Sequence, residues 1–266
     1  PGGWLKSPSM PGWVFRGNPS SDEISGHLHV YPLMHDLVAQ TPSEKARVLR
    51  LITAITGNIV DHGLILTGVG GKKTHWGRWD PKEINDTPFW YDDRGLNSLQ
   101  ILAFLSSAYR LTRNATYLAV FETLVKKHGY ADNVVNMKIT QPGDVDSNDD
   151  GLAFDTLVCM LWSARPAAGL PSNPLFEMVR AEVEAATQRW FDIVKRQRVA
   201  LWSYVYLMTF PNLEKDRPWD YRRAVSDAEW CFKTWPMDFL DWPVDNSERL
   251  DVWVNPQPNR NGAHGF

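Results

Sequence analysis

Hydrophobic residues occupy nearly every side of a helix in three stretches of this chain, residues 24–38, 95–111 and 152–162. The stretches between them are amphipathic, and residues 43–60 are the clearest example, with apolar residues at helical period on one face and charges on the other. A helix that is apolar all round must be buried, whereas a helix with a polar stripe lies at the surface. The pattern therefore predicts an all-α fold in which buried inner helices alternate with amphipathic outer helices.

This alternation predicts four antiparallel helical hairpins. The expected helices span residues 22–39, 43–60, 94–111, 115–128, 148–164, 174–195, 200–210 and 218–234. Pro32 removes a backbone donor and is expected to bend the first of them. The connections at residues 63–92 and 129–148 are long, and loops of more than about 12–15 residues in a compact domain are usually functional. The N-terminal ends of the inner helices are therefore the expected working face.

Acidic residues open each of the three apolar stretches. Six of them are expected to converge at one mouth of the helical array: Asp22, Glu23, Asp92, Asp93, Asp149 and Asp150. Two interpretations are open. Asp, Asn and Ser are preferred N-caps, and acids suit the positive end of a helix dipole. Alternatively, some of these carboxylates carry out chemistry.

Three phrases at the starts of the apolar helices resemble those of known proteins. They are SDEISGH at residues 21–27, DRGLNSL at residues 93–99 and SNDDGLAF at residues 147–154. Together with the alternating helices, they make residues 20–235 similar in architecture to the helical-toroid carbohydrate-active proteins, the six-hairpin glycosidases and polysaccharide lyases. The resemblance implies an (α/α) toroid-like array, incomplete at four hairpins, and a carbohydrate substrate. It carries over no catalytic residue.

Glycoside hydrolysis requires two carboxyl groups about 5–9.5 Å apart, one of which must keep its proton. The catalytic candidates are Asp22, Glu23, Asp93 and Asp150. A lyase would instead use a basic Tyr or His to abstract a proton beside a neutralised uronate. Separations beyond about 12 Å would exclude the hydrolase interpretation.

Aromatic residues are unusually abundant, with 13 tryptophans in 266 residues. Many lie beside Gly, Pro, Asp or Arg in the expected loops, where they either cover the core or stack on sugar rings. The candidates for stacking are Trp76, Trp90 and Trp202. Four further residues are expected to orient sugar hydroxyls or a uronate: His27, Arg94, Asn97 and Tyr204.

A possible calcium site begins near residue 144. The spacing of Asp146, Asn148 and Asp150 before Gly151 matches the opening of an EF-hand loop, but Leu157 stands where the loop needs a Glu. A simpler site would use Asp144, Asp146, Asn148 and Asp150, although capping of the following helix is the favoured use of these residues. No other cofactor is expected.

The bulk composition and two sequons indicate where the protein acts. A net charge of −3 and the absence of basic runs argue against a nucleic-acid partner, and no apolar run has membrane-spanning length. Asn85 and Asn114 begin Asn-x-Thr sequons, which favour secretion.

Residues 1–20 are expected to form an extended lead-in, residues 21–235 the helical domain, and residues 236–266 an irregular Trp- and Pro-rich tail.

Two functional hypotheses follow. The first is a secreted carbohydrate-active enzyme, a glycoside hydrolase or polysaccharide lyase, acting at the mouth of the array. The alternative is a non-catalytic glycan-binding or structural subunit of an extracellular assembly, with a protein partner or further chain segments completing the ring. Acids spent on helix caps would favour this alternative.

Overall fold

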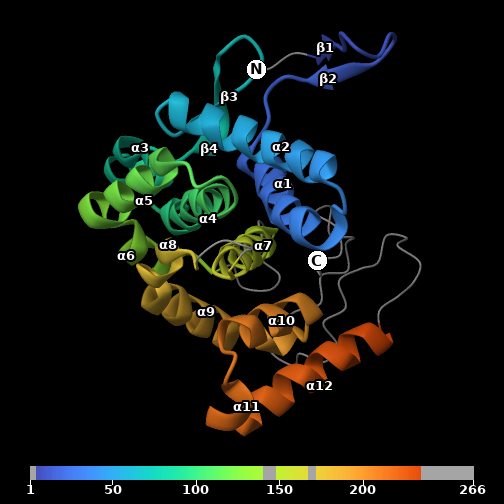
Figure 1. Cartoon of the computed structure of the whole chain (residues 1–266). Helices are drawn as coiled ribbons and strands as arrows, with labels where there is room; N and C mark the ends of the chain where they lie inside the picture. The colour runs from blue at the N-terminus through green and yellow to red at the C-terminus, as the bar shows by residue number, and fades with distance from the viewer. Residues whose placement is uncertain (1–3, 140–147, 167–171, 235–266) are drawn as a thin grey trace, which may run out of the picture.

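The computed structural model describes residues 4–139, 148–166 and 172–234, and these residues are mostly helical (Figure 1). The helices are α1 (Ser21–Leu33), α2 (Pro42–Asp61), α3 (Pro81–Asp86), α4 (Arg94–Thr112), α5 (Ala115–His128), α6 (Tyr130–Val135), α7 (Asn148–Ser163), α8 (Pro174–Glu177), α9 (Arg180–Val194), α10 (Ala200–Thr209), α11 (Leu213–Asp216) and α12 (Pro218–Thr234). A π-helix, η1 (Met34–Val38), continues α1, and two 3-10 turns are η2 (Pro88–Trp90) and η3 (Lys195–Gln197). The prediction of an all-α fold is confirmed.

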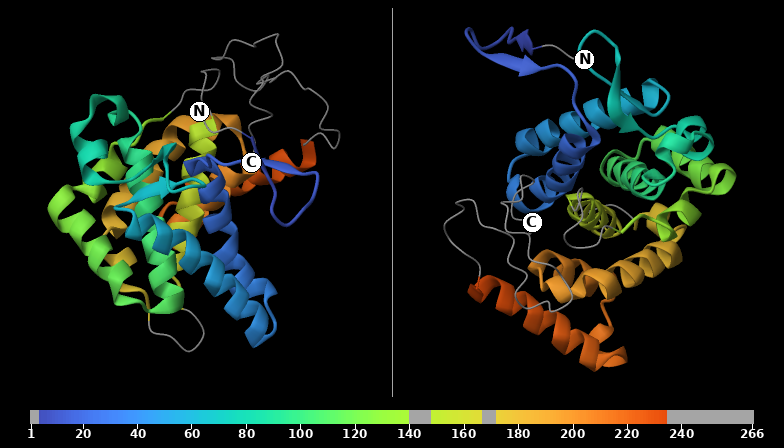
Figure 2. Two further views of the ribbon diagram at one scale, coloured as in Figure 1. Left: turned by 90° about the horizontal axis from the view of Figure 1, so that it is seen from above. Right: turned by 180° about the vertical axis from the view of Figure 1, so that it is seen from behind.

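Strands form only two small antiparallel pairs in the described part of the chain. β1 (Trp4–Lys6) pairs with β2 (Val14–Arg16), and β3 (Ile65–Thr67) pairs with β4 (Lys73–Arg78). The first pair projects away from the helices (Figures 1 and 2). The second pair lies within the connection of residues 63–92, which was expected to be a plain loop.

The core is centred on α4 and α7. Helix α4 is buried along almost its whole length, because its apolar residues surround the helix axis. Helix α7 packs against α1, α4 and α10, and it lies near the middle of the molecule in Figure 1. The residues on which the inner-helix prediction depends, Leu99, Leu102, Phe104 and Leu157, are all fully or almost fully buried.

Helix α1 departs from the prediction, because it is buried on one side only. Ile24 and Leu28 face the core, but Val30, Leu37 and Val38 are exposed. An apolar sequence is buried only where a neighbouring element covers it, and no described element covers this side of α1 and η1. The bend expected from Pro32 takes the form of the π-helix η1, which starts two residues after the proline.

The outer helices follow their amphipathic pattern. Val48, Ile52 and Ile59 on α2 are buried, and the opposite face of that helix is exposed. Thr41 caps α2, its side chain accepting from the Glu44 amide while the Glu44 carboxylate accepts from the Thr41 amide. The expected helix at residues 174–195 is divided into α8 and α9.

Candidate functional site

The expected working face includes the connection of residues 63–92. Trp79, the residue that follows β4, anchors this connection to the core. The indole of Trp79 is fully buried, and its Nε1 donates to Gln100 Oε1 at 3.0 Å. Its backbone amide donates to the Leu64 carbonyl at 2.9 Å, and its carbonyl accepts from the Tyr130 hydroxyl at 2.6 Å. Helices α4 and α6 therefore hold the end of the β3–β4 hairpin in place.

Four aromatic side chains contact one another beyond this anchor, and Tyr91 follows the last of them in the chain. We term these five residues the aromatic surface: His75, Trp76, Phe89, Trp90 and Tyr91. The Trp76 ring lies 6.2 Å from Phe89 at 27° and 6.0 Å from Trp90 at 87°. Phe89 and Trp90 make an edge contact at 4.9 Å. Trp90 is buried beneath, so the prediction that Trp90 itself stacks on a sugar is wrong, because its ring is not accessible. Trp76, Phe89 and Tyr91 remain 45%, 59% and 62% exposed. Exposed aromatic residues in one contiguous group are a common mark of a binding surface.

Arg94 extends the aromatic surface with a cation. Its guanidinium carbon lies 4.1 Å from the centroid of the Tyr91 ring, and this contact fixes the side chain of the first residue of α4. Asn97, one turn further along the helix, is buried, and its Nδ2 donates to the Arg78 carbonyl at 3.2 Å. The prediction that Asn97 orients a ligand does not fit this position, because its amide holds β4 instead.

Glu23 is used within its own helix. Its carboxylate accepts from the Ser20 amide at 2.6 Å and also pairs with the Ser20 hydroxyl, which completes a capping box at the start of α1. Asp22 has no partner outside its own turn in the contacts described, and it accepts from Ser21 Oγ at 3.3 Å. Partial burial raises the pKa of the Asp22 carboxyl above its ordinary value, although the residue as a whole is exposed.

The two remaining catalytic candidates are placed differently. Asp93 stands directly before α4, and its carboxylate lies 3.9 Å from Lys138 Nζ. Asp150 belongs to the first turn of α7, but its side chain lies outside the described residues. The Glu23 carboxylate is therefore engaged in a helix cap, and the Asp93 carboxylate lies beside a lysine.

Three further predicted sugar-contacting residues lie on α1 and α10. His27 is exposed on α1, where its Nδ1 lies 3.1 Å from the Tyr31 hydroxyl. Tyr204 is exposed on α10, 6.1 Å from the ring of Phe232. Trp202 is only 3% exposed and packs 4.4 Å from Phe154. The prediction that Trp202 stacks on a sugar is therefore wrong, because neither face of its ring is accessible.

The calcium candidates fall outside the part of the chain that can be described. Asp144 and Asp146 lie in the range 140–147, and the side chains of Asn148 and Asp150 are likewise outside the described residues. Within residues 4–139, 148–166 and 172–234, no three His, Cys, Asp or Glu side chains form a group suited to a metal ion.

The two sequon asparagines differ in accessibility. Asn114 is exposed at the start of α5, as expected, and its Oδ1 accepts from the Thr116 amide at 2.9 Å as an N-cap. Asn85 is half-buried in α3, and its Nδ2 donates to the His128 carbonyl at 2.9 Å. Asn85 is less accessible than Asn114, and its Nδ2 already donates to the protein, so Asn114 is the better acceptor site.

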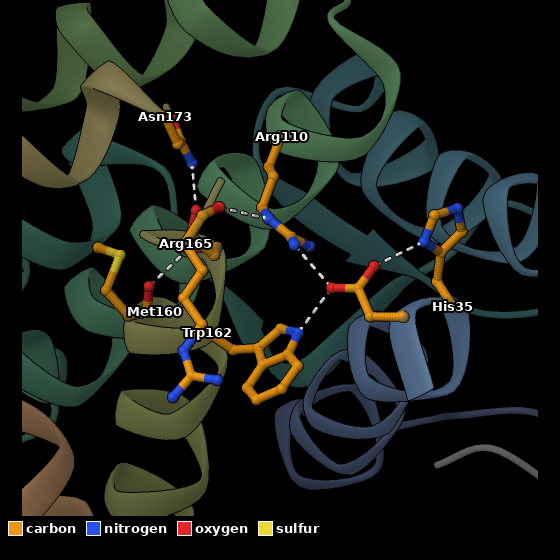
Figure 3. A network of polar contacts seen from close by, with 8 residues as sticks. His35, Arg110, Met160, Trp162, Arg165 and Asn173 are labelled. Carbon is orange, nitrogen blue, oxygen red and sulfur yellow. Dashed lines mark hydrogen bonds and ion pairs between the residues drawn. The ribbon is translucent and has the colours of Figure 1, made fainter. Parts of the chain in front are cut away.

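A partly buried polar network around Arg110, at the opposite ends of the inner helices, was not predicted from the sequence (Figure 3). Arg110 Nη2 donates to Asp36 Oδ2 at 2.6 Å, and Trp162 Nε1 donates to the same oxygen at 2.9 Å. His35 Nδ1 lies 2.8 Å from Asp36 Oδ1, and Arg110 Nε donates to the Arg165 carbonyl at 2.9 Å. Burial opposes ionisation of Asp36, but the bonds from these three side chains hold its pKa below the ordinary value.

This network joins η1 to the C-terminal ends of α4 and α7. The sequence contained one signal for it. Asp36 and Arg110 are charges of opposite sign inside stretches that were otherwise expected to be buried, and buried charges are normally paired.

Comparison with known proteins adds no assignment. A scan against protein-family models gave no match, and searches of curated proteins and of solved structures found no similar protein. No helix in the described part of the chain is long and apolar enough to cross a membrane.

Proposed function

We propose that this protein binds carbohydrate on the aromatic surface and that it does so as a non-catalytic glycan-binding unit. The observation that carries the proposal is the exposure of Trp76, Phe89 and Tyr91 around the buried ring of Trp90. The C–H faces of sugar rings pack well on exposed aromatic faces, and a few polar groups at the edge supply orientation. Arg94, held on Tyr91, and His75, 4.3 Å from Trp76, are placed to be those groups.

The use of the carboxylates supports binding over catalysis. A hydrolase needs two carboxyl groups facing one cavity, yet Glu23 is committed to the Ser20 cap and Asp93 lies beside Lys138. The Glu23 contact is what a helix cap requires, and the Asp93 contact is an ion pair, so both favour the non-catalytic alternative.

One observation favours the enzyme as a second candidate. The pKa of Asp22 is raised by partial burial, which is the direction that a general acid needs. A glycoside hydrolase built on Asp22 would require a second carboxylate from α4 or α7, and Asp93 and Asp150 are the two candidates. A lyase would instead use His27 or Tyr31 as its base.

We further propose that the four hairpins are part of an (α/α) toroid and that the protein is secreted. The uncovered apolar side of α1 and η1 is where a toroid would place a neighbouring hairpin, supplied by a further chain segment or a partner protein. The exposed sequon at Asn114 supports an extracellular location.

The test of carbohydrate binding is affinity electrophoresis of the full chain in gels that contain xylan, mixed-linkage β-glucan, polygalacturonate or hyaluronan. We expect retardation by at least one polymer, loss of that retardation in Trp76→Ala, and no change in Trp219→Ala. Trp219 is a matched control because its side chain is even more exposed than that of Trp76 but lies on α12. Migration unaffected by every polymer, or equal losses in the two variants, would refute the proposal.

Incubating the full chain in solution with the same four polymers separates the second candidate from the first. New reducing ends would indicate a hydrolase, and ultraviolet-absorbing unsaturated uronates would indicate a lyase. If Asp22→Asn abolished such products while retardation in the gel persisted, the enzyme would replace the non-catalytic protein as the better description.

A further inference from the structure

A buried chain of hydrogen bonds connects the start of α1 to the end of β4, and Gln100 on α4 is its central member. Gln100 Nε2 donates to Ser25 Oγ at 2.9 Å, and Gln100 Oε1 accepts from Trp79 Nε1 at 3.0 Å. Ser25 Oγ donates in turn to the Ser21 carbonyl at 3.0 Å. An indole N–H can only donate, so the oxygen of the Gln100 amide must face Trp79, and its orientation is fixed.

Water cannot substitute for these bonds. Gln100 and Trp79 are fully buried, and Ser25 is almost so. A buried polar group that loses its partner keeps the whole penalty of desolvation, so each bond in the chain constrains its neighbours. Gln100 therefore links the Trp79 side chain to the first turns of α1, while Tyr130 and the Leu64 carbonyl hold the Trp79 backbone.

Trp79 is important because it directly follows β4, the strand that carries Trp76. Trp76 lies three residues earlier on β4, and the β3–β4 pair is a two-stranded hairpin, which has marginal stability by itself in water. Sugar stacking requires a ring that is already held in place, because ordering it on binding would weaken the affinity. Leu66 on β3 also belongs to the core, and Asn97 binds the end of β4, but Trp79 is the buried side chain that follows β4 directly.

We propose that Gln100 is a positioning residue for the aromatic surface, holding Trp79 and thereby Trp76 in place against α1. Its functional consequence rests on the proposed carbohydrate binding, whereas its effect on β4 does not. Gln100 lies beneath the surface and contacts no ligand in this role. Removing its amide is expected to loosen β4 while the helices remain packed.

The chain offers a matched control at the other end of α4. Ser106 is also fully buried, and its Oγ lies 2.8 Å from Ser163 Oγ and 2.9 Å from Asn173 Nδ2. Ser106→Ala therefore breaks a comparable buried polar link in the same helix without touching β4. Any effect shared by Gln100→Met and Ser106→Ala reports general destabilisation, and any difference between them reports positioning.

The experiment compares the full chain with its Gln100→Met, Ser25→Ala and Ser106→Ala variants. Hydrogen exchange is measured on the peptide that covers β4, and dissociation constants are measured for whichever of the four polymers retards the wild type. Gln100→Met is expected to speed exchange in β4 by about tenfold or more and to weaken polymer binding by a similar factor. Ser25→Ala should give a smaller change in the same direction, and Ser106→Ala should leave both quantities unchanged.

The two measurements keep this inference separate from the proposed function. If no polymer binds the wild type but Gln100→Met alone speeds exchange in β4, the proposed function fails and the positioning role of Gln100 stands. Equal exchange rates in Gln100→Met and Ser106→Ala would overturn the positioning role, whatever the polymers do. Binding that survives Gln100→Met unchanged would also overturn it.

Discussion

Replacing Arg110 by methionine tests the buried network that joins η1, α4 and α7. Methionine keeps most of the length of the arginine side chain but removes its charge and all of its donors. The variant leaves Asp36 with Trp162 and His35 as its remaining partners, and it removes the bond to the Arg165 carbonyl. Removal of one member of a buried ion pair is strongly destabilising, because the other charge stays behind uncompensated.

The structure sets the expected magnitude. Breaking a fully buried pair costs about 3–5 kcal/mol. The side chain of Arg110 is 3% exposed but that of Asp36 is 18% exposed, so water can partly solvate the carboxylate that remains. We therefore expect a loss near the lower end, about 3 kcal/mol of unfolding free energy. Arg110 Nη1 is buried without a partner, so the double variant Arg110→Met/Asp36→Leu should recover part of that loss.

The assay is urea denaturation of the full chain at neutral pH and again under acid conditions. The pKa of Asp36 is lowered in the folded protein, so its ionised form adds stability above its unfolded pKa of about 3.9. That stability is lost as the pH falls through the lower folded pKa. The wild type should therefore lose more stability on acidification than Arg110→Met does.

Two results would refute this reasoning. A loss below about 1 kcal/mol for Arg110→Met would place the network in the range of surface ion pairs. A double variant less stable than either single variant would show that the two charges do not compensate each other. Either result would mean that the three helix ends are held by apolar packing alone.

Three further predictions concern single residues. Gly95→Ala should destabilise the fold by about 1–3 kcal/mol, because a Cβ would lie 2.8 Å from the Asn133 carbonyl oxygen. Gly26→Ala, with nothing within 4 Å of its Cβ, should be neutral or stabilising, and thermal unfolding of both variants measures the difference. Burial raises the pKa of the Cys159 thiol to about 12, so iodoacetamide at pH 8 should label it only after unfolding, as located by peptide mass spectrometry. Asn114→Ala should cost about 1 kcal/mol of stability by removing the α5 cap, whereas Asn114→Ser should retain the cap and remove the sequon, so that only glycosylation in a secreting host is lost.

Local sequence determined the helices and their caps. The amphipathic pattern of residues 43–60 gave a helix with Val48 and Ile52 inward, and the apolar run of residues 95–111 gave a buried helix. The use of Glu23 as a capping residue was also local, because a Ser three positions before a Glu is a known helix start. Such features depend on residues within one or two turns of each other.

The candidate site was only partly open to prediction. Trp76 and Trp202 are the same residue type in comparably aromatic surroundings, yet one is exposed and the other is buried against Phe154. The difference depends on which elements cover each ring, and those elements come from distant parts of the chain. The Asn97 amide likewise donates to the backbone of β4 and not to a ligand, because the fold brings the Arg78 carbonyl next to it.

The sequence by itself therefore determined the all-α class, the boundaries of most helices and the burial of α4, since periodicity and capping act over a few residues. Only the tertiary structure decided the rest: that one side of α1 is uncovered, that Asp36 meets Arg110, and that Gln100 joins Ser25 to Trp79. The physical reason is that hydrogen bonds and solvent exclusion depend on distance in space. Asp36 and Arg110 are 74 residues apart in the chain but 2.6 Å apart in the folded protein, and helical periodicity contains no information about that separation.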